Sequence, residues 1–367
     1  MKILFLSDIN NVHTKKWVKG ILEAGHEVLL FGLAGSKDDY YEDFPKLEII
    51  SADFTGQYGA SSFSKLKYLK TIKILKSAYS QFNPDIVHAH YATSYGMLGS
   101  LLKHKPFLIS VWGSDIYNFP NKSIFHKALL KRNLSKADYV FSTSHDMAAE
   151  TAKYTDKNIQ VIPFGVDVNV FRPKSSESAD SLTIGVVKTL EPNYGISYLI
   201  DAFKIVQSHF PDQNLKLLIV GDGSLKESLM HQTQRLEISD SVAFTGRIDH
   251  SEVNQYYNRM DIVVIPSRVN SESFGVAAVE ASACAKPVVA SNTGGLKEVI
   301  RDGINGLLAE PENPEDLAQK IQVLVDDPDL RSRLGKKGRE KVIENYDWNK
   351  CLEIQIDAYK DILKNIP

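Results

Sequence analysis

The chain has 367 residues, of which 43% are hydrophobic and 24% are charged, and its formal net charge is −2. These values are ordinary for a globular protein, and they exclude a disordered or fibrous chain and a protein that binds nucleic acid through its overall charge. The length suggests two domains, because single domains commonly hold roughly 100–200 residues.

The first ten residues, MKILFLSDIN, pass from one lysine through a short apolar run to Asp8. They lack the longer apolar segment and the small-residue cleavage site of a signal peptide, so we expect a buried first strand. No run of about 18 uncharged apolar residues follows, and two cysteines are too few for a disulfide-stapled secreted domain. The sequence therefore predicts a reduced cytoplasmic protein that does not span a membrane.

Short apolar runs alternate with longer helical patterns along the first half of the chain, as in a parallel sheet covered by helices. Strands are predicted at residues 2–6, 27–31, 47–50, 86–90, 107–112, 139–142 and 159–163. Helices are predicted between them, for example at residues 14–24 and 122–133. The polar segment at residues 173–181, with one proline and four serines, is typical of a linker.

The same alternation restarts after this linker. Strands are predicted at residues 182–187, 215–220, 242–245, 261–266, 287–290 and 306–309. The stretch from residue 314 to residue 363 is predicted to be wholly helical. This pattern favours two doubly wound α/β units in tandem.

Positive charge is concentrated in the first half. Residues 1–172 carry 21 Lys and Arg against 16 Asp and Glu, whereas residues 173–367 carry 22 against 29. This asymmetry predicts that the N-terminal half meets an anionic partner. The helical segment at residues 63–79 includes Lys65, Lys67, Lys70, Lys73 and Lys76, which do not gather on one helix face. It is either a solvated helix or part of a basic surface that faces a membrane.

Two histidines lie on the strand predicted at residues 86–90. His88 and His90 are two residues apart and therefore share one face of that strand. They bind a metal ion, line a cleft or belong to the core. Because no third ligand is evident, we favour a cleft or core position over metal binding.

Two carboxylates in the second half, Glu272 and Glu280, flank the predicted start of a helix at residues 275–284. Eight residues of helix separate them by about 12 Å, which suits two ends of an extended ligand better than one acid/base pair. The free N–H groups and the positive dipole end of the helix between them favour an anion such as a diphosphate. The alternative is an acidic cap and an ordinary helix-face glutamate.

Glycine- and serine-rich segments follow several strands of the second half, including residues 221–224 (GDGS), 244–247 (FTGR) and 292–295 (NTGG). Open α/β sheets bind their ligands at this carboxyl edge. Together with the E-x₇-E pattern, the series resembles the donor-binding domain of the family-4 retaining glycosyltransferases, or glycosyl transferases group 1. The resemblance implies the GT-B fold, in which two Rossmann-like, doubly wound α/β domains face each other across a cleft.

The resemblance carries over to single residues of the donor side. It implies that Glu272 holds hydroxyls of the donor sugar and that Glu280 binds the nucleotide ribose. Backbone N–H groups beside Glu272 are expected from Phe274, Gly275 and Val276.

Four more residues match donor-side positions of the family. Gly246 and Arg247 match positions that contact the base. Gly294 and Gly295 match a loop of close approach, where a side chain would crowd the ligand.

Lys188 lies in a segment similar to the phosphate-clamping stretch of the family, in which a basic residue is followed six residues later by lysine. It keeps the first position, where a cation offsets the charge that grows on the leaving diphosphate. Tyr194 occupies the second position, so one expected cation is missing, and Arg247 is a candidate to replace it. The alternative is that Lys188 only extends from a strand end into water.

The resemblance implies that the N-terminal domain binds the acceptor. The residues expected to line that side of the cleft are Asn10, His13, His88, His90 and Trp112. Trp112 stands where many members have a histidine, and an indole does not exchange protons. The contact that this histidine makes with a donor hydroxyl is therefore absent or comes from Asp115, His88 or His13. We expect Asp115 to act as an active-site carboxylate, with a capping aspartate as the alternative.

The implied domains are an acceptor-side domain at residues 1–172, a linker at residues 173–181 and a donor-binding domain at residues 182–347. The helix at residues 348–367 is expected to pack back onto the first domain, as in relatives.

The implied activity is that of a retaining, metal-independent hexosyltransferase. The donor is expected to be a UDP-sugar, whose departing diphosphate accepts the acceptor proton, so no catalytic triad or close carboxylate pair is needed. Neither a cofactor nor a nucleic acid is expected. The expected acceptor is a glycan or a lipid-linked molecule of cell-envelope or exopolysaccharide synthesis, at the inner face of an anionic membrane. The alternatives are a nucleotide-sugar epimerase on the same fold and a non-catalytic sugar-binding subunit.

Overall fold

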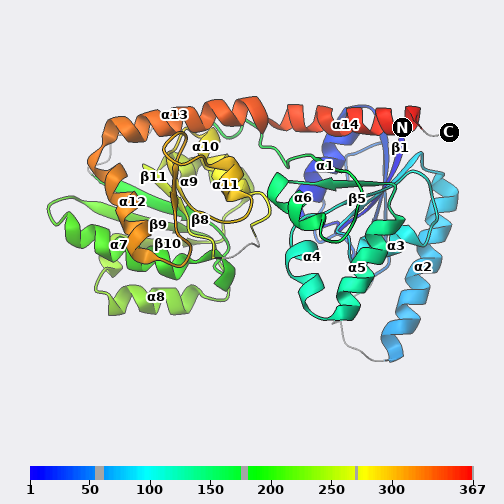
Figure 1. Cartoon of the computed structure of the whole chain (residues 1–367), viewed down its shortest axis with the longest axis horizontal. Helices are drawn as coiled ribbons and strands as arrows, with labels where there is room; N and C mark the ends of the chain where they lie inside the picture. The colour runs from blue at the N-terminus through cyan, green and yellow to red at the C-terminus, as the bar shows by residue number, and fades with distance from the viewer. Residues whose placement is uncertain (54–61, 175–180, 269–271, 366–367) are drawn as a thin grey trace. The chain divides into compact units, whose positions relative to one another are not determined.

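The computed structural model describes residues 1–53, 62–174, 181–268 and 272–365, without the side chains of residues 62–69. The chain forms two compact units. Unit 1 holds Met1–Pro163 together with Leu352–Pro367, and unit 2 holds Phe164–Cys351. In each unit, helices cover both faces of one sheet (Figure 1).

Unit 1 is built on a seven-stranded sheet with the order β3-β2-β1-β4-β5-β6-β7. Its strands are β1 (Lys2–Leu6), β2 (Glu27–Gly32), β3 (Leu47–Ser51), β4 (Ile86–His90), β5 (Phe107–Ser110), β6 (Tyr139–Ser142) and β7 (Ile159–Val161). Its helices are α1 (Val12–Glu23), α2 (Ser62–Phe82), α3 (Ser94–Ser100), α4 (Ser114–Tyr117), η1 (Phe119–Asn121), α5 (Ile124–Lys136) and α6 (His145–Thr151). Every strand pair is parallel, and the order reverses between β1 and β4. Ligands of open α/β sheets bind at such a reversal.

Unit 2 repeats the plan with a six-stranded parallel sheet of order β10-β9-β8-β11-β12-β13. Its strands are β8 (Leu182–Val187), β9 (Leu215–Val220), β10 (Val242–Gly246), β11 (Ile262–Ile265), β12 (Val288–Ser291) and β13 (Leu307–Ala309). The helices that follow β8 are η2 (Pro192–Tyr194), α7 (Ile196–His209), α8 (Lys226–Arg235), η3 (Ser239–Ser241), η4 (His250–Glu252), α9 (Val253–Asn258), α10 (Val276–Ala283), α11 (Leu296–Val299), α12 (Pro314–Asp326), α13 (Pro328–Asn345) and α14 (Trp348–Lys364).

The strands are apolar because both faces of each sheet are covered. In β11, all four side chains from Ile262 to Ile265 are buried, as expected for a central parallel strand between two helix layers. The core of unit 2 packs β8, β9 and β11 against α7 and α12. Among the described residues, no helix is both long and apolar enough to cross a bilayer.

Every strand predicted from the sequence is present, with ends that differ by at most two residues. The C-terminal region is helical, as predicted, and it is divided into the three helices α12, α13 and α14. The side chain of Asp327 accepts a hydrogen bond from the N–H of Leu330, and Pro328 occupies the first turn of α13. A proline and a capping aspartate start a new helix at this point.

The division between the units falls at Pro163, earlier in the chain than the predicted boundary at residue 172. The segment after Pro163 packs on unit 2: Val166 forms a β-bridge with Asp347, and the ring of Phe164 lies 6.2 Å from that of Phe274. Residues 175–180 of the predicted linker lie outside the described residues. Helix α14 begins in unit 2 and continues, from Leu352, as part of unit 1.

Candidate active site

The predicted donor residues of unit 2 lie at the carboxyl ends of its parallel strands. Lys188 follows β8 directly, Glu272 belongs to the loop after β11, and Gly246 ends β10. Glu280 lies in the second turn of α10. The topology of the sheet therefore gathers residues that are up to 92 positions apart in the chain, from 188 to 280, at one edge.

Lys188 and Glu272 form an ion pair at this edge. Lys188 Nζ lies 2.9 Å from both Oε1 and Oε2 of Glu272, and their side chains are 15% and 10% exposed. The Ser267 hydroxyl donates a hydrogen bond of 2.8 Å to Glu272 Oε2. The ammonium group also lies 4.5 Å from the ring centroid of Tyr194, which is within cation–π range. Tyr194 thus contacts the cation of Lys188 instead of supplying a second one.

Burial lowers the pKa of Lys188, but the attraction of Glu272, followed by smaller effects of Tyr194 and Glu280, outweighs it and raises the pKa above its ordinary value. Lys188 is therefore cationic at neutral pH. An uncompensated charge at so buried a position would be costly, so Glu272 and Lys188 each depend on the other until a ligand replaces one partner.

The loop that carries Glu272 is held by close backbone contact with the loop after β12. The N–H of Gly295 donates to the carbonyl oxygen of Glu272 at 2.9 Å. A Cβ atom on Gly295 would lie 2.6 Å from the carbonyl oxygen of Ser273 and 2.8 Å from Cα of Phe274. The sequence predicted that a side chain here would crowd the ligand. In this structure, such a side chain would displace the loop that positions Glu272.

The first turn of α10 offers donors to an anion. Its N-cap residue, Gly275, has φ +87° and supplies no capping side chain, and the first turn holds no acidic residue. A Cβ atom on Gly275 would lie 2.7 Å from Leu296 Cδ2, so a side chain is excluded both by space and by backbone conformation. Val276, the first residue of the helix, is half-buried. This helix start is suited to a diphosphate.

Glu280 has two partners that the sequence did not predict. The buried Tyr257 hydroxyl lies 3.2 Å from Glu280 Oε2, and His250 Nε2 lies 3.1 Å from Oε1. Tyr257 comes from α9 and His250 from η4, so no spacing rule connects them to Glu280. These contacts hold the carboxylate in one orientation, with His250 on the solvent side.

The predicted base-contacting residues lie beside the loop after β9. Gly246 has φ +73°, and its carbonyl oxygen accepts a hydrogen bond of 3.1 Å from the N–H of Gly221. Arg247 is exposed. Gly294 also has a positive φ of +48°.

Asp115 in unit 1 accepts three backbone hydrogen bonds. Its Oδ1 accepts from the N–H groups of Trp112 at 3.1 Å and Gly113 at 2.9 Å, and its Oδ2 accepts from Ala92 at 2.8 Å. Only 2% of the residue is exposed. Burial raises the pKa of Asp115, while the three N–H groups act in the opposite direction. Asp115 lies in the first turn of α4, whose N-cap is Gly113, so it does not cap the helix. Both of its oxygens are engaged in fixing the loops after β4 and β5, which supports a structural role.

We expect the substitution Asp115→Ala to destabilise unit 1 by about 3 kcal/mol or more, since each buried N–H left without a partner costs about 1–3 kcal/mol. Urea denaturation measures this loss, with Asp146→Ala on α6 as the control for a partly exposed aspartate. A variant as stable as the wild type whose turnover is reduced 100-fold would restore the catalytic assignment.

His88 and His90 are core residues, which is one of the two positions that the sequence favoured; the cleft position implied by the family resemblance is not the one they occupy. They are 1% and 2% exposed. His88 Nδ1 lies 2.6 Å from the hydroxyl oxygen of Tyr359 on α14, and its Nε2 lies 2.7 Å from Ser110 Oγ. Burial lowers the pKa of His88 to about 3 and that of His90 well below its ordinary value. Both rings are therefore neutral at physiological pH.

The remaining acceptor-side residues form a contact series that reaches toward the surface. The ring of His90 lies 4.3 Å from that of Trp112, and the ring of His13 lies 6.1 Å from Trp112 at an interplanar angle of 82°. Trp112 is 7% exposed, whereas His13 is half-buried. The side chain of Asn10 bonds the carbonyl of Gly35 and the N–H of Lys37, so it fixes the loop after β2.

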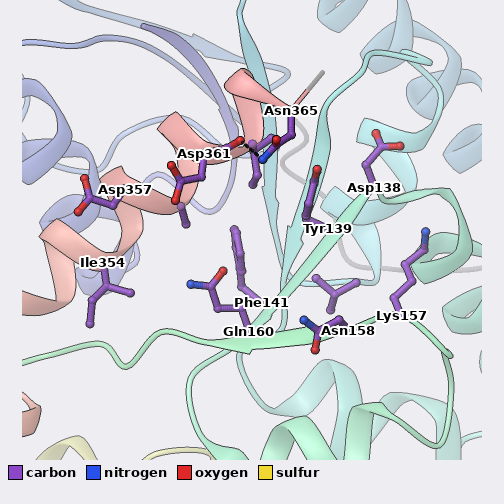
Figure 2. Close-up of a pocket in the computed structure, with 13 residues that line it drawn as sticks. Asp138, Tyr139, Phe141, Lys157, Asn158, Gln160, Ile354, Asp357, Asp361 and Asn365 are labelled. Carbon is purple, nitrogen blue, oxygen red and sulfur yellow. Dashed lines mark hydrogen bonds between the residues drawn. The ribbon is translucent and has the colours of Figure 1, made fainter. Parts of the chain in front are cut away.

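A pocket of about 560 Å³ lies in unit 1 between α14 and the strands β6 and β7 (Figure 2). Its lining includes Asp138, Tyr139, Lys157, Ile354 and Asp361. None of the predicted site residues lines it. Among the described residues, no group of three or more His, Cys, Asp and Glu is placed to hold a metal ion.

Two parallel sheets of these orders, with a cation, two carboxylates and a free helix start at the edge of the second, define a glycosyltransferase of the GT-B class. The sequence profile of glycosyl transferases group 1 matches residues 167–341, and that of the glycosyl transferase 4-like family matches residues 2–144. An uncharacterized glycosyltransferase of Methanocaldococcus jannaschii is 34% identical over 315 residues, which cover 82% of this chain and 82% of the relative. The chain belongs to the family of glycosyl transferases group 1.

Solved structures agree with this assignment of the fold. Sucrose-phosphate synthase from Thermosynechococcus elongatus has a TM-score of 0.85 at 23% identity, with all of both chains covered. Anabaena HepE in complex with UDP and glucose has a TM-score of 0.82 at 20% identity, with 98% of this chain and 100% of that chain covered. The predicted family and GT-B fold are confirmed.

Proposed function

We propose that the protein is a retaining, metal-independent hexosyltransferase that moves a sugar from a UDP-sugar to a lipid-linked or glycan acceptor in cell-envelope or exopolysaccharide synthesis. The observation that carries the proposal is the Lys188–Glu272 ion pair beside the uncapped start of α10, with Glu280 one helical turn further on. The complex of Anabaena HepE with UDP and glucose supports the choice of a UDP-sugar.

Each charged group has a defined role in the proposal. The diphosphate binds at the α10 start and takes over Lys188 from Glu272, because two phosphates carry more charge than one carboxylate. Glu272, released from Lys188, accepts hydrogen bonds from sugar hydroxyls, and Glu280 accepts them from the ribose. Lys188 then stabilises the negative charge that grows on the diphosphate as the anomeric C–O bond breaks.

The acceptor oxygen attacks from the face that the diphosphate leaves. The bond between the anomeric carbon and the acceptor oxygen forms, the bond to the diphosphate oxygen breaks, and that oxygen takes the acceptor proton. This route needs no catalytic base from the protein, in agreement with the structural role that we assign to Asp115. The proposed location is the cytoplasmic face of an anionic membrane, where lipid-linked acceptors are available.

A panel of nucleotide-sugars tests the proposal. We expect slow hydrolysis, or transfer to added acceptor sugars, with one or a few UDP-sugars. Conversion of the donor into an isomeric nucleotide-sugar would identify an epimerase, and binding without turnover would identify a sugar-binding subunit. Activity with donors of another nucleotide only would contradict the choice of UDP.

The stereochemistry of the product is a separate prediction. An α-linked donor should yield an α-linked product, which proton NMR identifies from the coupling of the new anomeric signal. The activity should persist in EDTA. A β-linked product would contradict retention, and loss of activity in EDTA that Mg²⁺ restores would contradict metal independence.

A further inference from the structure

The start of α5 presents two large apolar side chains to solvent. Ile124 is 78% exposed and Phe125 is 82% exposed, the highest values among the large hydrophobic residues that the structure describes. The others of this group are at most 52% exposed, the value of Ile304. Two adjacent apolar side chains so exposed are unfavourable in water unless something covers them.

The helix holds these side chains away from unit 1. Leu130, Asn133 and Leu134 form the buried face of α5, and Asn133 Nδ2 donates to the carbonyl of Ala92 at 2.9 Å. At 100° per residue, Ile124 and Phe125 fall on the opposite face. Ser123 caps the helix by accepting from the N–H of His126. These contacts hold α5 in place, and Ile124 and Phe125 are therefore kept on its exposed side.

The segment that carries this apolar pair is positively charged. Residues 116–137 contain no acidic residue, whereas they contain five cations: Lys122, Lys127, Lys131, Arg132 and Lys136. All five are exposed. None of them has an acidic partner within 4 Å in the part of the chain that the structure describes. The positive end of the helix dipole lies at Ile124 as well.

We propose that the N-terminal end of α5 docks on an anionic lipid bilayer, with Ile124 and Phe125 inserted among the acyl chains and the surrounding cations on the headgroups. The charge favours a bilayer over an apolar protein groove, because five exposed cations without an acidic partner among the described residues are complementary to an anionic leaflet. Docking at α5 rests on the membrane location in the proposed function and specifies which surface makes the contact. It does not depend on the chemistry of sugar transfer.

The structure favours α5 over α2, where the sequence first indicated a basic membrane surface. Lys70, Lys73 and Lys76 of α2 are exposed, but the described apolar residues near them, such as Leu75, face the core. Lys65 and Lys67 lie outside the described side chains. Charge alone at α2 gives weaker retention than charge combined with insertion at α5.

Sedimentation with vesicles tests the inference. The full-length protein should pellet with vesicles of phosphatidylcholine and phosphatidylglycerol at low salt, and less with phosphatidylcholine alone. The double substitution Ile124→Ser/Phe125→Ser should lower the partition coefficient at least about tenfold. The triple substitution Lys122→Gln/Lys131→Gln/Lys136→Gln should lower it similarly and reduce its salt dependence.

Matched controls separate docking from general effects. Ile304→Ser, in unit 2, removes another exposed apolar residue, and Lys70→Gln/Lys73→Gln/Lys76→Gln removes equal charge from α2. Both should bind vesicles much as the wild type does. In Phe125→Trp, the tryptophan emission should shift to the blue when anionic vesicles are added.

The results that would overturn the inference are distinct. They are absence of vesicle binding at low salt, equal binding by the α5 variants, and stronger loss in the α2 variant. A dimer seen by light scattering that Ile124→Ser/Phe125→Ser dissociates would show that a second copy covers the pair instead. Hydrolysis of a nucleotide-sugar in solution should stay unchanged in all these variants, so failure of the docking and failure of the transferase proposal are recognised separately.

Discussion

Replacing Glu272 with glutamine is expected to lower the rate of sugar transfer at least about 100-fold, and Lys188→Ala should have an effect of similar size. Glutamine keeps the shape of Glu272 but removes the charge that faces Lys188 at 2.9 Å. Alanine at position 188 removes the cation that we assign to the leaving diphosphate. Steady-state rates with the donor found in the panel measure both effects.

The stability of these variants gives an internal check. Each single substitution leaves one buried charge without its partner, which costs several kcal/mol, whereas the double variant Lys188→Ala/Glu272→Gln leaves none. The double variant should therefore regain part of the thermal stability and remain inactive. Glu340→Gln, which breaks the exposed Lys337–Glu340 pair of 2.7 Å on α13, is the control. Near-normal turnover in either single variant would remove that residue from the proposed site.

Unit 1 is expected to lose stability steeply as the pH falls below about 6.5, because it buries two neutral histidines. The pKa of His88 is lowered by burial to about 3, and that of His90 is lowered by burial and by the neighbouring His88 and His13. In the unfolded chain both rings take up a proton near pH 6.5. The unfolded state therefore binds more protons, and stability is complete above pH 6.5 and falls below it.

The expected change in the free energy of unfolding with pH is large. Two extra protons in the unfolded state give a slope of up to about 2.7 kcal/mol per pH unit between pH 6 and pH 4. Urea denaturation at several pH values measures the slope. The amide of glutamine in His88→Gln can replace both hydrogen bonds. This variant should reduce the slope to that expected for about one extra proton in the unfolded state. His231→Gln, at an exposed position of unit 2, should not change it, and an unchanged slope in His88→Gln would contradict the neutral buried state.

The sequence predicted the strands well because both sheets are parallel and covered on both faces, so each strand is an apolar run between polar loops. The family resemblance implied that Lys188 and Glu272 lie in one site, and the two side chains form an ion pair at the carboxyl edge of the second sheet. The sequence did not predict His250 and Tyr257 as partners of Glu280, because contacts between loops and helices leave no periodic trace. It also did not predict that His88 contacts Tyr359, which lies 271 residues further along the chain.

The sequence also did not predict which apolar side chains are exposed to solvent. Ile124 and Phe125 resemble core residues at the start of an amphipathic helix, and only the packing of α5 shows that its apolar face lies elsewhere. Likewise, Asp115 lies two residues after Gly113 and near a strand end, where the sequence suggested a catalytic carboxylate. Its three backbone partners become visible only when the loops after β4 and β5 are placed.

Unit 1 is built from two segments of the chain that are separated by the whole of unit 2, and this has a consequence for protein synthesis. The second segment of unit 1, which begins at Leu352, leaves the ribosome only after the whole of unit 2, yet its Tyr359 forms a hydrogen bond with His88 in the centre of the first sheet. Unit 2 is continuous and can fold as soon as it emerges, whereas the first sheet must wait for its final helix. Until then, Nδ1 of His88 lacks its hydrogen-bond partner, so the nascent first unit is the stage of biogenesis most open to chaperones.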